Sequence, residues 1–198
     1  MSLGRRLRSQ WLAMEAAGTT PLSLLLDGVA QASAHLHYPV GDVYDTAHHT
    51  QFYYHVHRDG EVGHIHLFQR ARGMPAGLAP LCPSGEANAP CHLVAIGLGP
   101  HGDAVELFTT NRWVTGESWY PAAAVKAMLS GFRLTTHSRL QPVAAWLEAL
   151  LGFYLPAIET LIDQRDAAVA RWAGINPLDD GTLEVLSRIS VDPARDTG

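Results

Sequence analysis

The chain has little cysteine, no excess of positive charge and no long apolar run, and each absence removes a class of protein. Its 198 residues include two cysteines, Cys82 and Cys91. That is too few for a disulfide scaffold and is typical of a reducing cytoplasm, although one bridge between them stays open. The net charge of -5 gives no basic surface for nucleic acid. No apolar run approaches the roughly 20 residues that span a bilayer, so no membrane partner is expected.

Histidine, in contrast, is abundant. The chain has 11 histidines against 14 lysines and arginines together. Most of them lie within one short stretch of the sequence, namely His35, His37, His48, His49, His55, His57, His64 and His66. Imidazole is a ligand for late first-row transition metals as well as a proton donor and acceptor, so this crowding is the strongest functional signal in the sequence.

The order of the sequence patterns predicts one α+β domain over residues 1–198. Helices are expected over about 3–34, a ligand-rich loop over 35–51, and a four- to five-stranded antiparallel sheet over about 52–119. Further helices are expected over about 121–190, including a short one around 183–189, before a frayed tail over 192–198. The N- and C-terminal helices would pack on one face of the sheet.

Individual residues refine these boundaries. Thr20 is a suitable N-cap and Pro21 a suitable first residue for the second helix. Pro156 is expected to break or kink the long C-terminal helix. Segments 92–98 and 104–110 read as a second hairpin, and 112–119 as a fifth strand.

The first hairpin allows a register to be derived. Two alternating segments flank Asp59-Gly60, which is a strong signal for a two-residue turn. With this turn His55 faces His64, Tyr53 faces His66 and His57 faces Val62. Opposed residues share a face of the sheet, so one face carries all four histidines. The other face carries Phe52, Tyr54, Val56, Ile65 and Leu67.

Four imidazoles on one patch can bind a metal ion. Opposed Cβ atoms lie about 4.5 to 5.5 Å apart, so three or four ring nitrogens can converge. The predicted ligands are His55, His57, His64 and His66, and the predicted ion is Fe, Cu, Zn or Ni. Tyr53, opposite His66, is the expected catalytic proton or hydrogen-bond partner. The alternative is a purely structural or solvated histidine face.

The preceding loop offers further candidate ligands. These are His35, His37, Asp42, His48 and His49. They could complete the same site or form a second one. Alternatively, this segment is a polar surface loop in which Asp42 and Asp45 accept hydrogen bonds from turn amides.

One short motif resembles a known pattern. His55-Val-His57, followed after three residues by Glu61, resembles the His-x-His-x-x-x-Glu core of the cupin metal motif, found in small β-barrels with mononuclear metal sites. The match covers seven residues, without the family's flanking glycines or second motif, and no family is assigned from it. The resemblance implies Glu61 as a ligand, whereas the register places Glu61 on the face opposite His55 and His57.

Three functions fit these observations. The first is a metalloenzyme, oxidative in character, acting on a small molecule. The second is a non-catalytic metal storage, delivery or sensing protein. The third is a metal-dependent hydrolase with Asp42, Asp45 or Glu61 as general base. Ligand imidazoles must be neutral, so metal release is expected below about pH 6. A homo-oligomer stays open.

Overall fold

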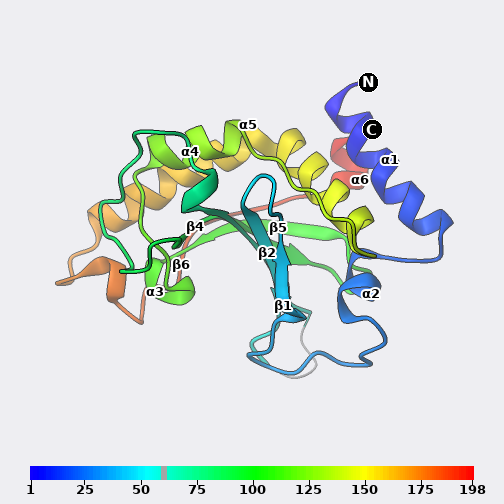
Figure 1. Cartoon of the computed structure of the whole chain (residues 1–198), viewed down its shortest axis with the longest axis horizontal. Coiled ribbons are helices and arrows are strands. Elements are labelled where there is room, and N and C mark those ends of the chain that lie inside the picture. The colour runs from blue at the N-terminus through cyan, green and yellow to red at the C-terminus, as the bar shows by residue number, and fades with distance from the viewer. Residues whose placement is uncertain (59–61) are drawn as a thin grey trace.

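One antiparallel sheet organises the chain, whose computed structural model describes residues 1–58 and 62–198. Its six strands follow the sequence in spatial order, each paired with the next (Figure 1). The strands are β1 (Tyr38–Tyr44), β2 (Thr50–His55), β3 (His64–Arg70), β4 (Pro90–Leu98), β5 (Ala104–Thr110) and β6 (Val185–Ser190). Consecutive strands form an antiparallel meander as far as β5, and β6 returns from the end of the chain to pair with β5.

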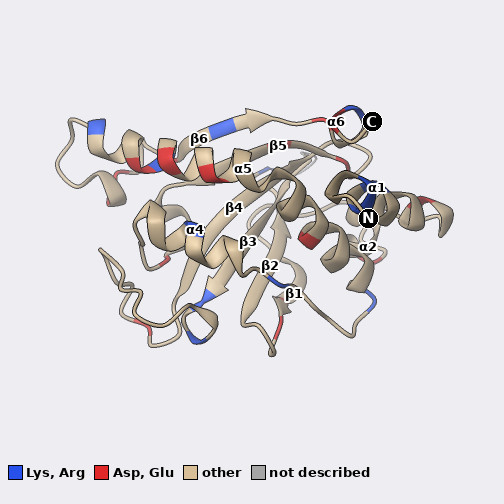
Figure 2. Ribbon diagram, turned by 90° about the horizontal axis from the view of Figure 1, so that it is seen from above, with Lys and Arg blue, Asp and Glu red and all other residues tan. Residues whose placement is uncertain are grey.

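The helices lie before, after and between the strands. They are α1 (Leu3–Ala16), α2 (Pro21–Leu26), α3 (Arg112–Thr115), α4 (Ala122–Ser130), α5 (Gln141–Arg171) and α6 (Pro193–Asp196), with 3-10 turns at Ala71–Gly73 and Pro177–Asp179. Figure 2 shows α4 and α5 lying across one side of the strands, and α1 contacts the N-terminal half of α5. The predicted α+β class, with terminal helices on the sheet, is therefore confirmed.

The sheet has six strands rather than four or five. The predicted loop 35–51 contains β1, and the helix expected around 183–189 is strand β6. In β6, Ser187 pairs with Thr109 and their hydroxyl oxygens lie 2.7 Å apart. The exposed edge of β5 supplies backbone partners that local helix propensity does not reveal. The expected fifth strand at 112–119 instead begins with α3, whose N-cap Asn111 accepts a hydrogen bond from the Arg112 amide.

Thr20 and Pro21 begin α2 as predicted, with a Thr20–Ser23 capping box, but this helix ends at Leu26 rather than near residue 34. Of the two outcomes expected at Pro156, a break does not occur, because α5 continues through this residue to Arg171. Buried Tyr154 and Ile158 hold the turns on either side, and their packing outweighs the missing amide.

By length and composition alone, α5 is long and apolar enough to cross a membrane. Half of the 18-residue segment that meets this criterion is buried inside the fold, however. Because a core helix passes the same test, this feature is weak evidence for a membrane span.

The C-terminal tail is more ordered than expected. Its residues 193–196 form the helical turn α6, capped by Asp192. Tyr154 Oη donates a hydrogen bond of 2.7 Å to Asp196 Oδ2, and Thr197 Oγ1 donates to the Pro193 carbonyl. These two contacts attach the tail to α5 and to itself.

The register of the first hairpin is confirmed. His55 pairs with His64, Tyr53 with His66 and Tyr54 with Ile65. The strands end at the first of these pairs, so the predicted His57–Val62 pair is not part of the ladder. A Cβ at Gly63 would lie 1.9 Å from the His55 carbonyl oxygen, so glycine permits this close approach. The predicted turn residues Asp59 and Gly60, and the alternative ligand Glu61, lie outside the described residues.

Alternation along these strands separates two surfaces. The face toward α4, α5 and α1 holds the aliphatic and aromatic core, which includes Phe52, Tyr54, Ile65, Leu67, Val94 and Ile96. The opposite face, here named the histidine face, is formed by Tyr53, His55, His64, His66, Phe68, His92 and Phe108.

Candidate metal centre

Three imidazoles of the histidine face converge on one point. The Nε2 atoms of His55 and His64 lie 2.7 Å apart, those of His64 and His66 3.0 Å apart, and those of His66 and His55 3.2 Å apart. The pairing of β2 with β3 sets this arrangement, because it places His55 directly opposite His64 with His66 two residues further along.

The Nε2 atoms of His55, His64 and His66 form a triangle with the dimensions of one face of a metal coordination shell. An ion bound at about 2.0 to 2.1 Å by three nitrogens at right angles separates those nitrogens by about 3 Å. The three observed separations lie around this value. Three close nitrogens cannot all be satisfied by sharing protons among themselves, since a neutral imidazole has one N–H. An ion on the open side of the triangle would accept all three lone pairs.

His57 is the fourth member of the group and lies at its solvent edge. Its ring centroid is 5.0 Å from that of His55 and 5.2 Å from that of His64. Ligand atoms of these three residues all lie within 4.8 Å of one another. Two triads therefore share His55 and His64. The one completed by His66 has the closer nitrogen spacing, and the one completed by His57 faces solvent. The histidines clustered here, one of them buried, could hold a metal ion.

Burial keeps these imidazoles neutral. Together with neighbouring imidazoles it lowers the pKa of His55 from 6.5 to about 4 and that of His64 to about 2. The pKa of fully buried His66 is also lowered well below its ordinary value by burial. Neutral imidazoles have the free lone pair that coordination requires, so the site is prepared for a cation at neutral pH.

Aromatic rings surround the cluster. The Tyr53 ring lies 5.3 Å from that of His66 and packs edge-on against His55 at 5.5 Å. Phe108 contacts His64 from the β5 side at 5.1 Å. Burial raises the pKa of the Tyr53 phenol above its ordinary value, so this residue keeps its proton at neutral pH. Tyr53 thus lies beside the candidate ligands, as predicted, as a neutral phenol.

Two of the loop histidines lie near the cluster. The His37 ring stacks on Tyr53 at 3.6 Å and lies 5.9 Å from that of His55. Its Nδ1 is 2.9 Å from Asp42 Oδ1, and Asp42 also accepts a hydrogen bond from Gln51. His35 is attached through its backbone, whose amide donates to the Val56 carbonyl. His37 immediately precedes β1 and lies in the surroundings of the cluster, where Asp42 contacts its ring.

The other loop candidates are at the opposite end of β2. His48 and His49 precede Thr50, about 20 Å along the strand from His55 at roughly 3.3 Å per residue. Asp45 Oδ2 lies 2.8 Å from His48 Nδ1 and accepts hydrogen bonds from Thr135, which lowers the pKa of Asp45 to about 2 against the effect of burial. The structure does not bring His48 and His49 to the cluster, because they belong to this turn at the other end of the strand.

Sequence reasoning missed His92 as a neighbour of the cluster. Its Nε2 lies 2.9 Å from Nδ1 of His66, and both side chains are buried. Cys91, the preceding residue, is on the core face, and both Cys91 and Cys82 are free, so the bridge between them is not formed. Period-two alternation could have separated Cys91 from His92. The pairing of β4 with β3 could not be derived, because a long irregular segment connects them.

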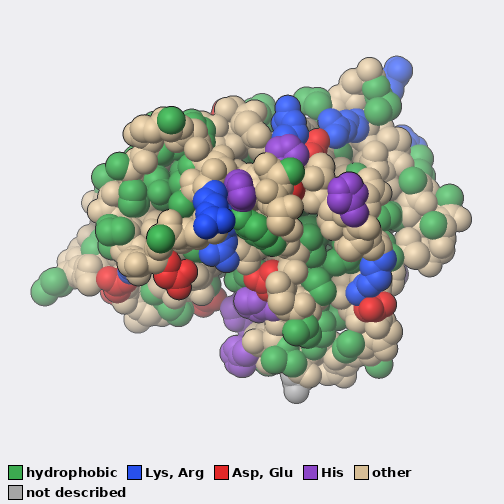
Figure 3. Space-filling view, viewed as in Figure 1, with side chains coloured by type: hydrophobic (Ala, Val, Ile, Leu, Met, Phe, Trp, Pro, Cys, Tyr) green, Lys and Arg blue, Asp and Glu red, His purple; other side chains and the backbone are tan. Residues whose placement is uncertain are grey.

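A shallow hollow adjoins the cluster. It has a volume of about 310 Å³ and is lined by His57, His64 and Phe108 together with two carboxylates, Glu106 and Glu184. Glu184 Oε1 lies 4.0 Å from His57 Nε2. In Figure 3 histidine side chains gather at a hollow in the lower part of the surface. A small molecule in this hollow would meet the exposed side of the candidate ligands.

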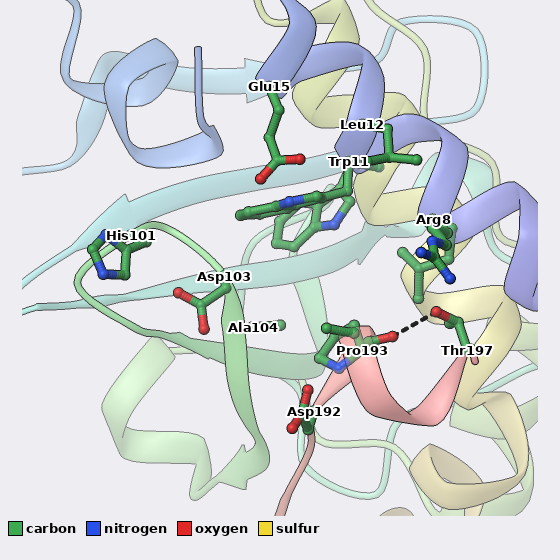
Figure 4. Close-up of a pocket in the computed structure, with 13 residues that line it drawn as sticks. Arg8, Trp11, Leu12, Glu15, His101, Asp103, Ala104, Asp192, Pro193 and Thr197 are labelled. Carbon is green, nitrogen blue, oxygen red and sulfur yellow. Dashed lines mark hydrogen bonds between the residues drawn. The ribbon is translucent and has the colours of Figure 1, made fainter. Parts of the chain in front are cut away.

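A larger cavity lies elsewhere. Its volume is about 510 Å³, and it opens between α1, the β4–β5 turn and α6. Figure 4 shows Trp11 within it, with Glu15, Asp103 and Asp192 spaced around it. Cavity size alone would select this place as the site. The group of described residues with metal-ligand spacing is on the histidine face, however, so that face carries the candidate metal site.

Fold and site together define an α+β protein with a histidine cluster that could hold a metal ion. The chain belongs to the family described as domain of unknown function (DUF6969), whose model matches residues 2–191. No curated protein and no solved structure matches the chain. The function must therefore be argued from the site itself.

Proposed function

We propose that this protein is a metal-dependent oxidoreductase that acts on a small molecule. A single transition metal ion, Fe, Cu, Zn or Ni, would be held by His55, His64 and His66, with His57 at the open side. The observation that carries this proposal is the triangle of Nε2 atoms, 2.7 to 3.2 Å apart. Fe and Cu are the members of this set that support oxidation by dioxygen.

An enzyme is favoured over a storage protein by the arrangement of the ligands. All three project from one face of the sheet, so an ion bound to them keeps coordination positions on the other side. The adjoining hollow of about 310 Å³ gives a small substrate access to those positions. A storage site would instead saturate the ion, which would require His57 to move into the shell as a fourth ligand.

Oxidation is favoured by the surroundings of the cluster. Tyr53, Phe68 and Phe108 enclose it with apolar ring surface, which limits access of water to reactive intermediates. The Tyr53 phenol can donate a proton or hydrogen bond to a ligand of the ion.

Hydrolysis is the second candidate, and one contact supports it. Glu184 lies beside His57 in the hollow, where a carboxylate could accept a proton from a metal-bound water. The bases expected from sequence are less suitable, because Asp42 contacts His37 and Gln51, and Asp45 is buried in the distant turn.

A cytoplasmic location and a homo-oligomer remain proposals, the first supported by the two free cysteines.

Metal analysis tests the proposal. The full chain, purified without an affinity tag and reconstituted with Fe²⁺, Cu²⁺, Ni²⁺ or Zn²⁺, should retain about one ion per chain. His55→Ala/His64→Ala should lose it, since both triads share these residues. His101→Ala/His137→Ala is the matched control, because it removes two exposed histidines outside the cluster. Equal metal content in both variants, with unchanged circular dichroism, would refute the site.

Activity assays then separate the two reactions. Dioxygen consumption by the Fe or Cu form with a panel of small reductants is the expected positive result. Ester hydrolysis by the Zn form that is lost in Glu184→Gln would favour the hydrolase. A wild-type chain that binds no metal after reconstitution would remove both reactions.

A further inference from the structure

A second imidazole lies directly behind one of the candidate ligands. His92 is on β4, opposite Phe68 of β3, at a point where the register of the two strands shifts. Its Nε2 is 2.9 Å from Nδ1 of His66, and the exposed fractions of these two residues are 2% and 0%. Water cannot readily replace either partner at this depth, so each ring depends on the other for this hydrogen bond.

The contact is directional once Nε2 of His66 binds an ion. Coordination uses the lone pair of Nε2, so the proton of His66 must be on Nδ1 and is donated to His92 Nε2. The proton of His92 is then on its own Nδ1, which lies 3.3 Å from Thr110 Oγ1. With an ion bound, a hydrogen-bond network would run from the ion through His66 and His92 to Thr110. In this network the tautomer of each ring sets that of the next.

Two contacts hold His92 in the position that this hydrogen-bond network needs. Its backbone amide donates a hydrogen bond of 2.5 Å to Oε2 of the buried Glu117, which fixes this part of β4. Its ring packs edge-on against Phe68 at 5.3 Å.

We infer that His92 is a positioning residue that holds the His66 ring with Nε2 toward the ion, and that Thr110 anchors His92 in turn. This inference rests on the proposed metal site and adds a part of it that touches neither ion nor substrate. Partners of this kind set the orientation and basicity of ligating histidines, and their loss commonly weakens metal binding 10- to 100-fold.

Two substitutions distinguish positioning from simple packing. His92→Leu fills the space but removes the acceptor, whereas His92→Gln keeps a carbonyl oxygen near the position of Nε2. Titration of the full chain with Co²⁺ should show binding weakened about 10- to 100-fold in His92→Leu and within a few-fold of wild type in His92→Gln. The visible absorption of bound Co²⁺ should shift in the leucine variant, since a rotated His66 changes the ligand field.

Thr110 provides a second route if His92→Leu does not fold. Thr110→Val keeps the shape of the side chain and removes the oxygen, while Thr110→Ser retains it. We expect Co²⁺ binding several-fold weaker in the valine variant and near wild type in the serine variant.

Distinct results overturn distinct claims. Unchanged Co²⁺ affinity and spectrum in folded His92→Leu would refute positioning and leave the metal site intact. Equal losses in His92→Leu and His92→Gln, or in both Thr110 variants, would show a purely structural role. A wild-type chain that binds no Co²⁺ would refute the proposed site and this inference together.

Discussion

The two faces of the sheet are formed by the same strands and are buried to the same degree, yet burial has a different effect on each. His66 and Leu67 are consecutive residues of β3, and both are 0% exposed. Leu67 joins the core under the helices, where burial of apolar surface stabilises the fold. His66 joins the cluster, where the same burial disfavours protonation.

Burial therefore produces stability on one face and reactivity on the other. Unprotonated imidazoles packed within about 3 Å of one another contribute little to the stability of a sheet, but they could hold a cation. The comparison predicts that the histidine face depends on pH and metal, whereas the core face depends on volume.

Acid should have the largest effect, and it should act through the histidine face. The pKa of His55 is lowered to about 4 and that of His64 to about 2, whereas both titrate near 6.5 in the unfolded chain. Below about pH 6.5 the unfolded chain binds protons that the folded chain excludes. The free energy of unfolding therefore decreases as the pH is lowered. We expect the chelator-treated protein to lose most of its free energy of unfolding by about pH 4, as measured by urea denaturation.

The matched variant His55→Leu/His64→Leu should show a weaker dependence on pH between 6.5 and 4. Stability of the wild-type chain that is constant over this range would contradict the comparison between the faces.

Metal should reverse part of this loss. Zn²⁺ at about 1,000 times its Kd should raise the free energy of unfolding of the wild-type chain by about 4 kcal/mol. The His55→Ala/His64→Ala variant should gain little, and His101→Ala/His137→Ala should match wild type. The low pKa values of the ligands also move the expected release of metal from about pH 6 to below about pH 5, because protons compete less well. Complete release at pH 6 would refute this shift.

A cavity on the core face should have an effect of similar size, which metal does not change. Leu67→Ala should lower the free energy of unfolding by about 2 to 5 kcal/mol, since a buried leucine leaves a space that the core cannot fill. Its Zn²⁺ affinity should stay near that of wild type. A loss of metal binding as large as that of His55→Ala/His64→Ala would show that the two faces are not independent.

The smallest effect is expected at Glu117, the buried carboxyl that contacts the His92 amide. Burial, opposed by Arg165, raises its pKa to about 7. The stability associated with this group is present below about pH 4.5 and is lost as pH rises through 7. Glu117→Gln removes the ionisation, so the variant should gain about 1 to 2 kcal/mol relative to wild type between pH 5 and pH 8. No pH-dependent difference in urea denaturation would contradict the assignment.

Local pattern was enough to predict the core of the candidate site. The alternation of residues 52–55 and 64–67 around a turn signal placed His55 opposite His64 and Tyr53 opposite His66, and the structure has these pairs. Side chains of a strand alternate with a period of two, and a slip of one residue would put histidines into the core. Such information is contained in adjacent residues and needs no knowledge of the rest of the fold.

Long-range pairing accounts for what the pattern did not predict. His92 reaches His66 only because β4 pairs with β3 after a long connection, and β6 becomes a strand only because β5 offers it an edge. His48 and His49 are near His55 in sequence but lie at the other end of an extended strand. Neighbours along the chain therefore reveal which face a residue occupies. Which residues stand behind that face depends on hydrogen bonds and packing between distant segments, and these form only in the folded molecule.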